Sequence, residues 1–532
     1  MKILKILVIT LGLMLVFTAC GKNSDLPVQY DATEVSLSDE GIKVNGFTAS
    51  TDSSEDVYIA NDIVYYEDGK DFTYGEGTEK DAHSKAEAEA HTVVHITKAG
   101  TYLLEGKLSK GQIAVDLGED AKENPEAVVT LILGGVDITC DVAPGVIFYN
   151  VYECGNTDTE KATKDADTSN AGANVIIADG SINTVNGSYV ERIYDQDTIV
   201  FNEDKTEVED AKKLHKYDGA FYSKMSMNID GEKENSGVLN INASNEGLDS
   251  ELHLAINGGS INISSGNDGI NTNEDGVSVT TINGGTLRIR VTGETGEGDG
   301  IDSNGWLVIN GGTVVAEACS QSADAGIDSD MGIHINGGTV IATGSMLDRV
   351  EADGQNYAVF SFAEKQNENT SIILKNEAAE TVREFMPENA YSTLIYSSPD
   401  LTAGTYTLWS GDKQLLRYGS GFGGHGRPDM MPEGTKPEGE PPEMPEGFEP
   451  PEGFEVPEND LSQSRPQKPD GEMPPMGQKP HEDAERPEKP EENGEIVPTD
   501  GESGFSKEHT DEFKITDGGN MFSIGGYVNQ SE

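Results

Sequence analysis

A short two-part phrase that recurs four times between residues 245 and 343 constrains the fold of this chain more than any other feature. Each copy has a small or acidic residue, then Gly, an apolar residue, Asp or Asn, and Ser or Thr, followed after a short strand by Ile-Asn-Gly-Gly. The asparagines of the four Ile-Asn-Gly-Gly copies, Asn257, Asn283, Asn310 and Asn336, are 26, 27 and 26 residues apart. A constant period of this length predicts a solenoid in which each copy forms one coil.

Between the turns, apolar and polar residues alternate, as in residues 287–291, and no helical periodicity is present. The coils are therefore predicted to consist of short strands, which gives a parallel β-helix. Alternation places two columns of apolar side chains inside it. These columns are Leu248, Ile270, Ile301 and Ile327, and Ile256, Ile282, Ile309 and Ile335. The Gly-Gly pairs are expected at corners that need positive φ, and the four asparagines are expected to stack as an amide ladder.

The first twenty residues have the order of an export signal. Two lysines precede an apolar run, residues 6–19, which is short for a membrane span. The tripeptide that ends in Cys20 resembles a lipobox, with Phe17 where leucine is usual. We expect residues 1–20 to be a lipoprotein signal peptide, so that a lipid on Cys20 anchors the exported protein at the outer face of the cell membrane. An ordinary secreted protein with an unmodified Cys20 is the alternative.

Composition divides the rest of the chain into segments. A formal net charge of −58 with 35% hydrophobic residues indicates that parts of the chain are solvated rather than packed. Repeats of Pro-Glu-Gly fill one such part, and proline with like charge opposes a core. A solenoid also needs a cap over its open strand edge. The predicted segments are a flexible tether (21–50), the parallel β-helix (51–345), a β-rich cap (346–420), a disordered acidic segment (421–502) and a strand that returns to the cap (503–532).

Three cysteines follow Cys20, namely Cys140, Cys154 and Cys319. In an exported protein Cys140 and Cys154 are able to form a disulfide, whereas a buried free thiol such as Cys319 is equally natural in a solenoid core. The sequence leaves both arrangements open.

One polar residue of each copy follows an inward apolar residue and is therefore expected to face outward, in a column on successive coils. This column is Asp249, Asn271, Asp302 and Asp328. Coils are about 4.8 Å apart, and two carboxylates at that spacing repel by on the order of 3 kcal/mol at an effective dielectric constant near 20. Either the side chains splay into water or a divalent cation lies among them.

A second line of acids accompanies this column. It consists of Glu246, Asp268, Asp299 and Asp324. Carboxylate, amide and carbonyl oxygens suit Ca²⁺, and the lack of clustered His and Cys in the sequence argues against zinc. We therefore expect bound calcium. The alternative is that Asp-Gly and Asn-Gly serve only as turn residues.

Four phrases taken together resemble a family of bacterial cell-surface carbohydrate-binding proteins. They are Asp-Gly-Ile-Asp-Ser at 299–303, Ile-Asn-Gly-Gly-Thr at 309–313, Phe-Tyr-Ser-Lys at 221–224 and Gly-Thr-Tyr-Leu-Leu-Glu-Gly at 100–106. The resemblance runs from about residue 92 to 416. It implies a right-handed parallel β-helix similar to pectate lyases, bound calcium, and affinity for plant cell-wall polysaccharides such as cellulose and polygalacturonate.

An acidic protein repels a polyuronate unless a cation lies between them. Calcium held by Asp302 and Asp328 would bridge protein and sugar carboxylates. The candidates for direct sugar contact are Tyr222, Lys224, Arg288 and Trp306. Trp306 is expected to face out of its sheet and stack on a sugar ring, or to be covered by a neighbouring loop. Arg288 is expected to be free for a carboxylate, whereas Arg290 is expected to pair with Glu317 on the next coil.

Binding without catalysis is the predicted function, with no catalytic residues, a polysaccharide and the membrane as partners, no nucleic acid, and a monomeric state. A calcium-dependent polysaccharide lyase is the first alternative, because calcium and a nearby base, Lys224 or Arg288, are what β-elimination needs. A structural adhesin or spacer, stiffened by cations alone, is the second.

Overall fold

The computed structural model describes residues 30–202, 204–417 and 510–527, and nearly all of the regular structure there is β-strand. The predicted signal peptide with Cys20 and the predicted disordered segment 421–502 lie outside the described residues. Within the described part of the chain, no helix has the length and apolar character needed to cross a membrane.

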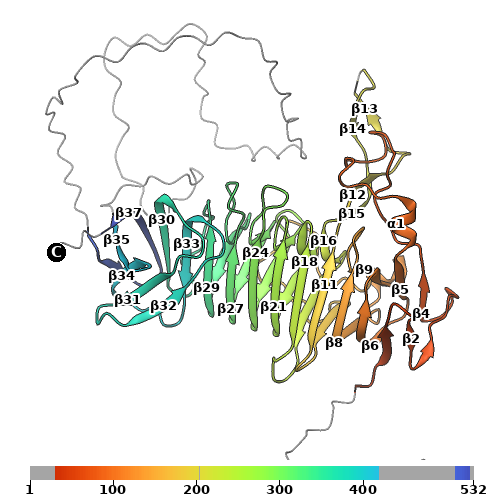
Figure 1. The fold of residues 1–532 in the computed structure, drawn as a ribbon, viewed down its shortest axis with the longest axis horizontal. Helices are drawn as coiled ribbons and strands as arrows, with labels where there is room; N and C mark the ends of the chain where they lie inside the picture. The colour runs from red at the N-terminus through yellow and green to blue at the C-terminus, as the bar shows by residue number, and fades with distance from the viewer. Residues whose placement is uncertain (1–29, 203, 418–509, 528–532) are drawn as a thin grey trace, which may run out of the picture. The chain divides into compact units, whose positions relative to one another are not determined.

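Three runs of strands repeat along the molecule (Figure 1). The first run is an eight-stranded sheet in which only the β4–β5 pair is antiparallel. Its strands are β4 (Val57–Ala60), β5 (Thr92–Ile96), β7 (Gly111–Asp116), β9 (Val146–Asn150), β16 (Gly219–Ser223), β19 (Glu246–Ser250), β22 (Ile270–Thr272) and β25 (Ile301–Ser303). The last three strands of this sheet, β19, β22 and β25, come from the first three copies of the sequence phrase.

The other two runs begin on shared long strands, β6 (Gly100–Leu108) and β8 (Val129–Thr139), and all of their pairings are parallel. The second run continues through β10 (Ala173–Ile177), β17 (Met227–Gly231), β20 (Leu254–Ile256), β23 (Val279–Ile282), β26 (Trp306–Ile309) and β28 (Gly332–Ile335). The third continues through β11 (Ile182–Gly187), β18 (Val238–Ala243), β21 (Ser260–Ser265), β24 (Thr286–Val291), β27 (Thr313–Glu317) and β29 (Thr339–Gly344).

The two predicted apolar columns form the centre of this structure. Leu248 pairs with Ile270 and Ile270 with Ile301, and each of these side chains is 0% exposed. In the second column, Ile282 and Ile309 are in register and buried. Both columns belong to one continuous hydrophobic cluster. The parallel pairing of equivalent strands one period apart therefore follows from the burial of one apolar face per strand.

The Gly-Gly corners and the asparagine ladder are also present. Asn310 donates from Nδ2 to Oδ1 of Asn283 at 2.9 Å and accepts from Nδ2 of Asn336 at 2.8 Å. The second glycine of each pair has positive φ, for example +78° at Gly312. A Cβ at Gly312 would lie 2.7 Å from the carbonyl oxygen of Gly285 on the previous coil. Close approach of coils thus requires glycine at this corner.

We predict that Gly312→Ala lowers the free energy of unfolding by about 2 kcal/mol more than Gly118→Ala, as measured by urea denaturation. Both positions have positive φ, which costs about 1–2 kcal/mol for alanine. Only Gly312 has backbone in the way of a Cβ, since nothing lies within 4 Å of one at Gly118. Equal losses in the two variants would show that the corner relaxes without cost.

The segment predicted to be a tether is ordered from residue 30 onward, so that prediction is wrong for the described residues. It contains β1 (Thr33–Leu37), β2 (Lys43–Val44) and β3 (Phe47–Thr48). Strand β1 pairs in parallel with β6, and Val35 and Leu37 are buried against the first coil. Two alternating apolar residues within a polar stretch thus cover the N-terminal edge of the parallel strands.

An insertion between β11 and β16 interrupts the coils. It forms an antiparallel hairpin of β12 (Val190–Tyr194) and β15 (Lys213–Tyr217), with the short pair β13 (Val200–Phe201) and β14 (Val208–Asp210) beyond it. We call the β12–β15 pair the insertion hairpin. The single α-helix of the described residues, α1 (Lys85–Glu89), and the 3₁₀-helix η1 (Glu119–Glu123) lie in other connections between strands.

At the other end, a β-rich cap covers the last coil. Strand β33 pairs antiparallel with β29, so the final edge of the third run of strands is paired rather than open. The strands of the cap are β30 (Tyr357–Gln366), β31 (Ile372–Asn376), β32 (Thr381–Phe385), β33 (Tyr391–Ser397), β34 (Gly404–Ser410), β35 (Lys413–Arg417), β36 (Phe513–Ile515) and β37 (Gly519–Tyr527). The last two come from the segment predicted to return, and β37 pairs with β30. Phe360, Phe513 and Phe522 pack together in a separate hydrophobic cluster.

All three cysteines of the described residues are free thiols. Cys140 and Cys319 are buried, and burial raises the pKa of the Cys140 thiol to about 12. Of the two arrangements that the sequence left open, the structure therefore contains the one without a Cys140–Cys154 bond.

Candidate functional site

The predicted column of polar residues is in register on successive strands. Asp249 of β19 pairs with Asn271 of β22, which pairs with Asp302 of β25. Asp328 continues the column, because its backbone N–H donates to the carbonyl oxygen of Ile301 at 2.7 Å. The repeat therefore brings these side chains together as the spacing predicted.

The prediction that the whole column faces solvent is wrong at its N-terminal end. Asp249 is 0% exposed and Asn271 is 7% exposed, whereas Asp302 and Asp328 are half-buried. The cause is the insertion hairpin, which lies over the first members of the column. Its Tyr217 ring packs against that of Tyr222, with centroids 5.2 Å apart.

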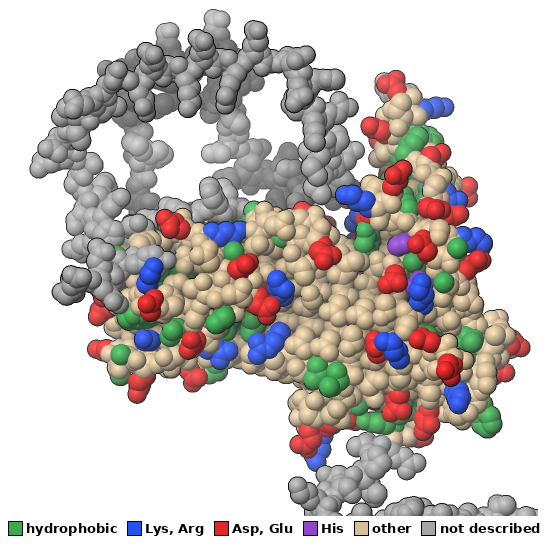
Figure 2. Space-filling view, viewed as in Figure 1, with side chains coloured by type: hydrophobic (Ala, Val, Ile, Leu, Met, Phe, Trp, Pro, Cys, Tyr) green, Lys and Arg blue, Asp and Glu red, His purple; other side chains and the backbone are tan. Residues whose placement is uncertain are grey.

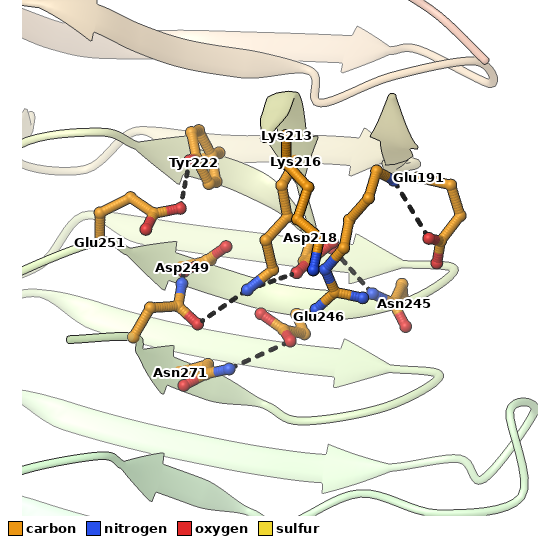
Figure 3. A network of polar contacts seen from close by, with 12 residues as sticks. Glu191, Lys213, Lys216, Asp218, Tyr222, Asn245, Glu246, Asp249, Glu251 and Asn271 are labelled. Atoms are coloured by element: carbon orange, nitrogen blue, oxygen red, sulfur yellow. Dashed lines mark hydrogen bonds and ion pairs between the residues drawn. The ribbon is translucent and has the colours of Figure 1, made fainter. Parts of the chain in front are cut away.

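Three carboxylates form what we call the first acid cluster: Asp218, Glu246 and Asp249 (Figure 3). One oxygen of each lies within 4.8 Å of the others, and all three side chains are buried. Asn271 donates from Nδ2 to Oε1 of Glu246 at 3.1 Å. Three buried oxygens here have no hydrogen-bond partner, namely Glu246 Oε2, Asp249 Oδ2 and Asn271 Oδ1. Buried acceptors without partners are costly, so a cation in contact with these oxygens would stabilise the cluster.

Burial and mutual repulsion govern the protonation of this cluster. Burial, followed by the charge of Asp218, raises the pKa of Glu246 to about 8. Burial and the charge of Glu246 raise the pKa of Asp249 well above its ordinary value. Lys216 of the insertion hairpin offsets part of this effect, because its Nζ lies 3.1 Å from Oδ2 of Asp218. Without a further cation, the carboxylates of the cluster are therefore not all ionised at neutral pH.

The second acid cluster consists of Asp299, Asp302 and Asp328, whose oxygens also lie within 4.8 Å of one another. All three side chains are half-buried, so this cluster is open to a ligand from solvent. Oδ1 of Asp299 accepts the backbone N–H of Ala325 at 2.5 Å. Burial raises the pKa of Asp299 well above its ordinary value, and the charge of Asp328 contributes further.

Two predicted ligands are instead used by the backbone. Oδ1 of Asp268 accepts the N–H of Asp299 at 2.6 Å, and Oδ2 of Asp324 accepts the N–H of Gly298 at 2.8 Å. Each acid thereby holds the turn of the neighbouring coil, as the alternative of turn chemistry predicted. Five of the eight predicted metal ligands belong to the two acid clusters, and Asn271 contacts the first cluster through its side chain.

The donor set of both clusters fits a hard divalent cation. Every candidate ligand is a carboxylate or amide oxygen, which Ca²⁺ prefers, and no His or Cys of the described residues belongs to either cluster. The unpartnered buried oxygens of the first cluster are what a bound cation would satisfy. When bound, calcium would supply positive charge to both clusters and open coordination positions at the second.

The four predicted sugar-contacting residues are not brought together. Tyr222 is 1% exposed and donates to Oε1 of Glu251 at 2.5 Å, so its predicted contact with solvent and sugar is wrong. Lys224 is half-buried, and burial with the nearby charge of Lys122 lowers its pKa. Arg288 is exposed on β24, between Asn262 and Val315 as predicted.

Trp306 is only half-buried on β26, which belongs to another run of strands than the acid clusters. Arg290 is in register with Glu317, as predicted, but its partner is different. Its Nε lies 3.6 Å from Glu388 of the cap, while Oε2 of Glu317 accepts the backbone N–H groups of Glu388 and Asn389.

Sequence reasoning missed Asp218 and Lys216. Asp218 immediately precedes Gly219, which is in register with Glu246. In this register Asp218 aligns with Asn245 and not with the line of acids, so the repeat gave no signal for it. Lys216 carried no signal either, because it belongs to the insertion and not to the repeat.

Of the comparisons with known proteins, the family model agrees with a carbohydrate-related role. A family model described as carbohydrate-binding domain-containing protein matches residues 90–164 and 155–372, more than half of the chain. The comparison with curated proteins found no match. A solved structure described as the polysaccharide lyase-like protein from C. thermocellum, gadolinium derivative, is 18% identical and covers 58% of this chain and 92% of its own, with a TM-score of 0.31. The chain thus belongs to the family of carbohydrate-binding domain-containing proteins.

Proposed function

We propose that this protein is a right-handed parallel β-helix, anchored at the cell surface through Cys20, that binds cell-wall polysaccharide in a calcium-dependent manner without cleaving it. Polygalacturonate or pectin and cellulose are the proposed ligands. The observation that carries the proposal is the half-buried second acid cluster, which solvent reaches, in a chain of a carbohydrate-binding family. We propose that the protein acts as a monomer.

The charge of the protein explains why a cation is needed. Asp299, Asp302 and Asp328 would repel a uronate at any distance short enough for contact. Calcium accepts six to eight oxygen ligands, and three side chains leave positions for sugar carboxylates and hydroxyls. Protein and polysaccharide anions would then share one cation.

We assign different roles to the two acid clusters. A polymer cannot reach Asp218, Glu246 and Asp249, because these side chains are buried beneath the insertion hairpin. A cation there would stabilise the coils. The second acid cluster is accessible and is therefore the proposed glycan-facing site.

The outer face of the third run of strands supports binding of sugar hydroxyls. Asn240, Asn262 and Arg288 are in register along it, and Asn262 donates to Oδ1 of Asn240 at 3.0 Å. Figure 2 shows that the middle of this face carries few charged or apolar side chains. Amide groups with a neighbouring guanidinium are suited to neutral or uronic sugars.

We predict that Arg288→Ala lowers retention of the protein on polygalacturonate about fivefold, or roughly 1 kcal/mol, and leaves calcium affinity unchanged. Arg288 is exposed and on a different sheet from the second acid cluster. Arg349→Ala is the matched control, because Arg349 is also exposed but pairs with Glu351 at 2.8 Å. Equal retention of both variants would remove Arg288 from the glycan surface.

A calcium-dependent polysaccharide lyase is the second candidate. The lowered pKa of Lys224 favours it, because a lysine base has to lose its proton near neutral pH. Strand β16, which ends next to Lys224, pairs with β19 of the first acid cluster. That cluster is buried, so a cation held there would be screened from substrate. We therefore place the lyase second.

A further inference from the structure

The insertion hairpin places an ammonium group against the first acid cluster. Nζ of Lys216 lies 3.1 Å from Oδ2 of Asp218 and donates to Oδ1 of Asn273 at 3.3 Å. Figure 3 shows the Lys216 side chain descending from the hairpin between Asp218 and Asp249. Its side chain is 26% exposed, so it has a route to solvent. Because Lys216 belongs to the insertion hairpin and not to the repeat, its ammonium is able to move away from Asp218 while the repeated strands stay paired.

This ammonium does not complete the cluster. Two of its three possible hydrogen bonds are directed to Asp218 and Asn273. The buried oxygens Glu246 Oε2, Asp249 Oδ2 and Asn271 Oδ1 still lack partners. Arg192 of strand β12 adds a second positive charge that acts on Asp218 and Glu246, yet these three oxygens remain without partners. The two monovalent side chains are therefore a partial substitute for a divalent cation that would contact several oxygens at once.

The second acid cluster has a different charge environment. The charged groups that act most strongly on Asp299 are Asp328, Asp302 and Asp324, all of them acids. On Glu246, by contrast, Lys216 is among the strongest charges. The two acid clusters offer similar oxygens, but only the first lies beside the Lys216 ammonium. They should therefore differ in their affinity for a divalent cation.

We propose that Lys216 is an internal counter-ion that competes with the divalent cation for the first acid cluster. The cation fills the second cluster first, and it enters the first only at higher concentration, when Lys216 swings out and frees the inner face of the insertion hairpin. Lys216 thereby makes the first acid cluster the weaker of the two cation sites. This inference rests on the cation of the proposed function, and it adds an order of filling and the residue that sets it.

Calcium titration by isothermal calorimetry tests this inference in the Asp302→Asn background, where the remaining binding reports the first acid cluster. Lys216→Met, which keeps the apolar stem but not the charge, is expected to bind calcium at least tenfold more tightly than the parent. Lys216→Arg is expected to retain the parent affinity. Lys213→Met is the matched control, because Lys213 lies on the same strand but pairs with Glu76 at 3.0 Å.

Hydrogen exchange provides a second readout. Saturating calcium is expected to speed exchange in β12 and β15 of the parent, because the Lys216 contact is lost. Unchanged or weaker calcium affinity in Lys216→Met, with native circular dichroism, overturns the inference while the proposed function stands. If wild type and Lys216→Met both bind no calcium up to about 10 mM, well above extracellular site affinities, the calcium part of the proposed function fails and this inference fails with it.

Discussion

Asp302→Ala is expected to weaken calcium binding at the second acid cluster at least tenfold, which is about 1.4 kcal/mol, and to reduce retention on polygalacturonate by a similar factor. Asp302 is in register with Asn271 and shares the cluster with Asp299 and Asp328. Removal of one of three carboxylates lowers both the charge and the number of ligands that hold the cation. Calorimetric titration with calcium and a polysaccharide pull-down measure the two effects.

Asp330→Ala is the matched control for this experiment. Asp330 is an exposed carboxylate two residues beyond Asp328 and outside both acid clusters. Asp330→Ala removes the same formal charge as Asp302→Ala, so it accounts for any general effect of the protein's net charge on binding to a polyanion. An Asp302→Ala variant with an unchanged calcium titration would contradict the assignment of this cluster as the cation site.

Without calcium, the protein is expected to lose stability as the pH rises. The pKa of Glu246 is raised from its ordinary value of 4.5 to about 8 in the folded protein, chiefly by burial. A raised folded-state pKa means that the folded state holds the proton more tightly. The resulting stabilisation is fully present below about pH 4.5 and is lost as the pH passes about 8. We expect the free energy of unfolding in chelator to fall by about 3–5 kcal/mol over this range.

Urea denaturation at pH 5.5, 7.0 and 8.5, with chelator and with calcium, measures this effect. Calcium needs ionised ligands, so the stability that it adds is expected to grow with pH. Glu246→Gln is expected to flatten the pH dependence in chelator, because its amide does not titrate. A stability in chelator that stays constant or rises between pH 5.5 and 8.5 would show that these carboxylates remain charged and satisfied without a cation.

The repeat made the centre of the fold predictable. Alignment of the copies of the phrase, each with one inward isoleucine or leucine per strand, leaves a single register in which the apolar columns coincide, and Leu248, Ile270 and Ile301 occupy it. The asparagine ladder and the glycine corners follow from the same register. The positions of Asp249, Asn271 and Asp302 relative to one another were therefore predictable as well.

What could not be predicted depends on segments outside the repeat. The burial of Tyr222 and Asp249 comes from the insertion hairpin, whose sequence has no period to align. Likewise, Arg290 meets Glu388 because the cap folds back on β24 and β27, a contact about a hundred residues away in the chain. Local alternation identifies which side of a strand a residue faces, but not what covers that side.

The most direct test of the proposed function is a pull-down of the protein on polygalacturonate, with calcium and then with chelator, while absorbance near 235 nm is followed for unsaturated product. We predict retention that requires calcium, reverses with chelator and produces no absorbance change. A rise in absorbance would contradict binding without cleavage and identify a lyase. Equal retention with and without calcium, or no retention on either polygalacturonate or cellulose, would contradict the calcium-dependent binding proposed here.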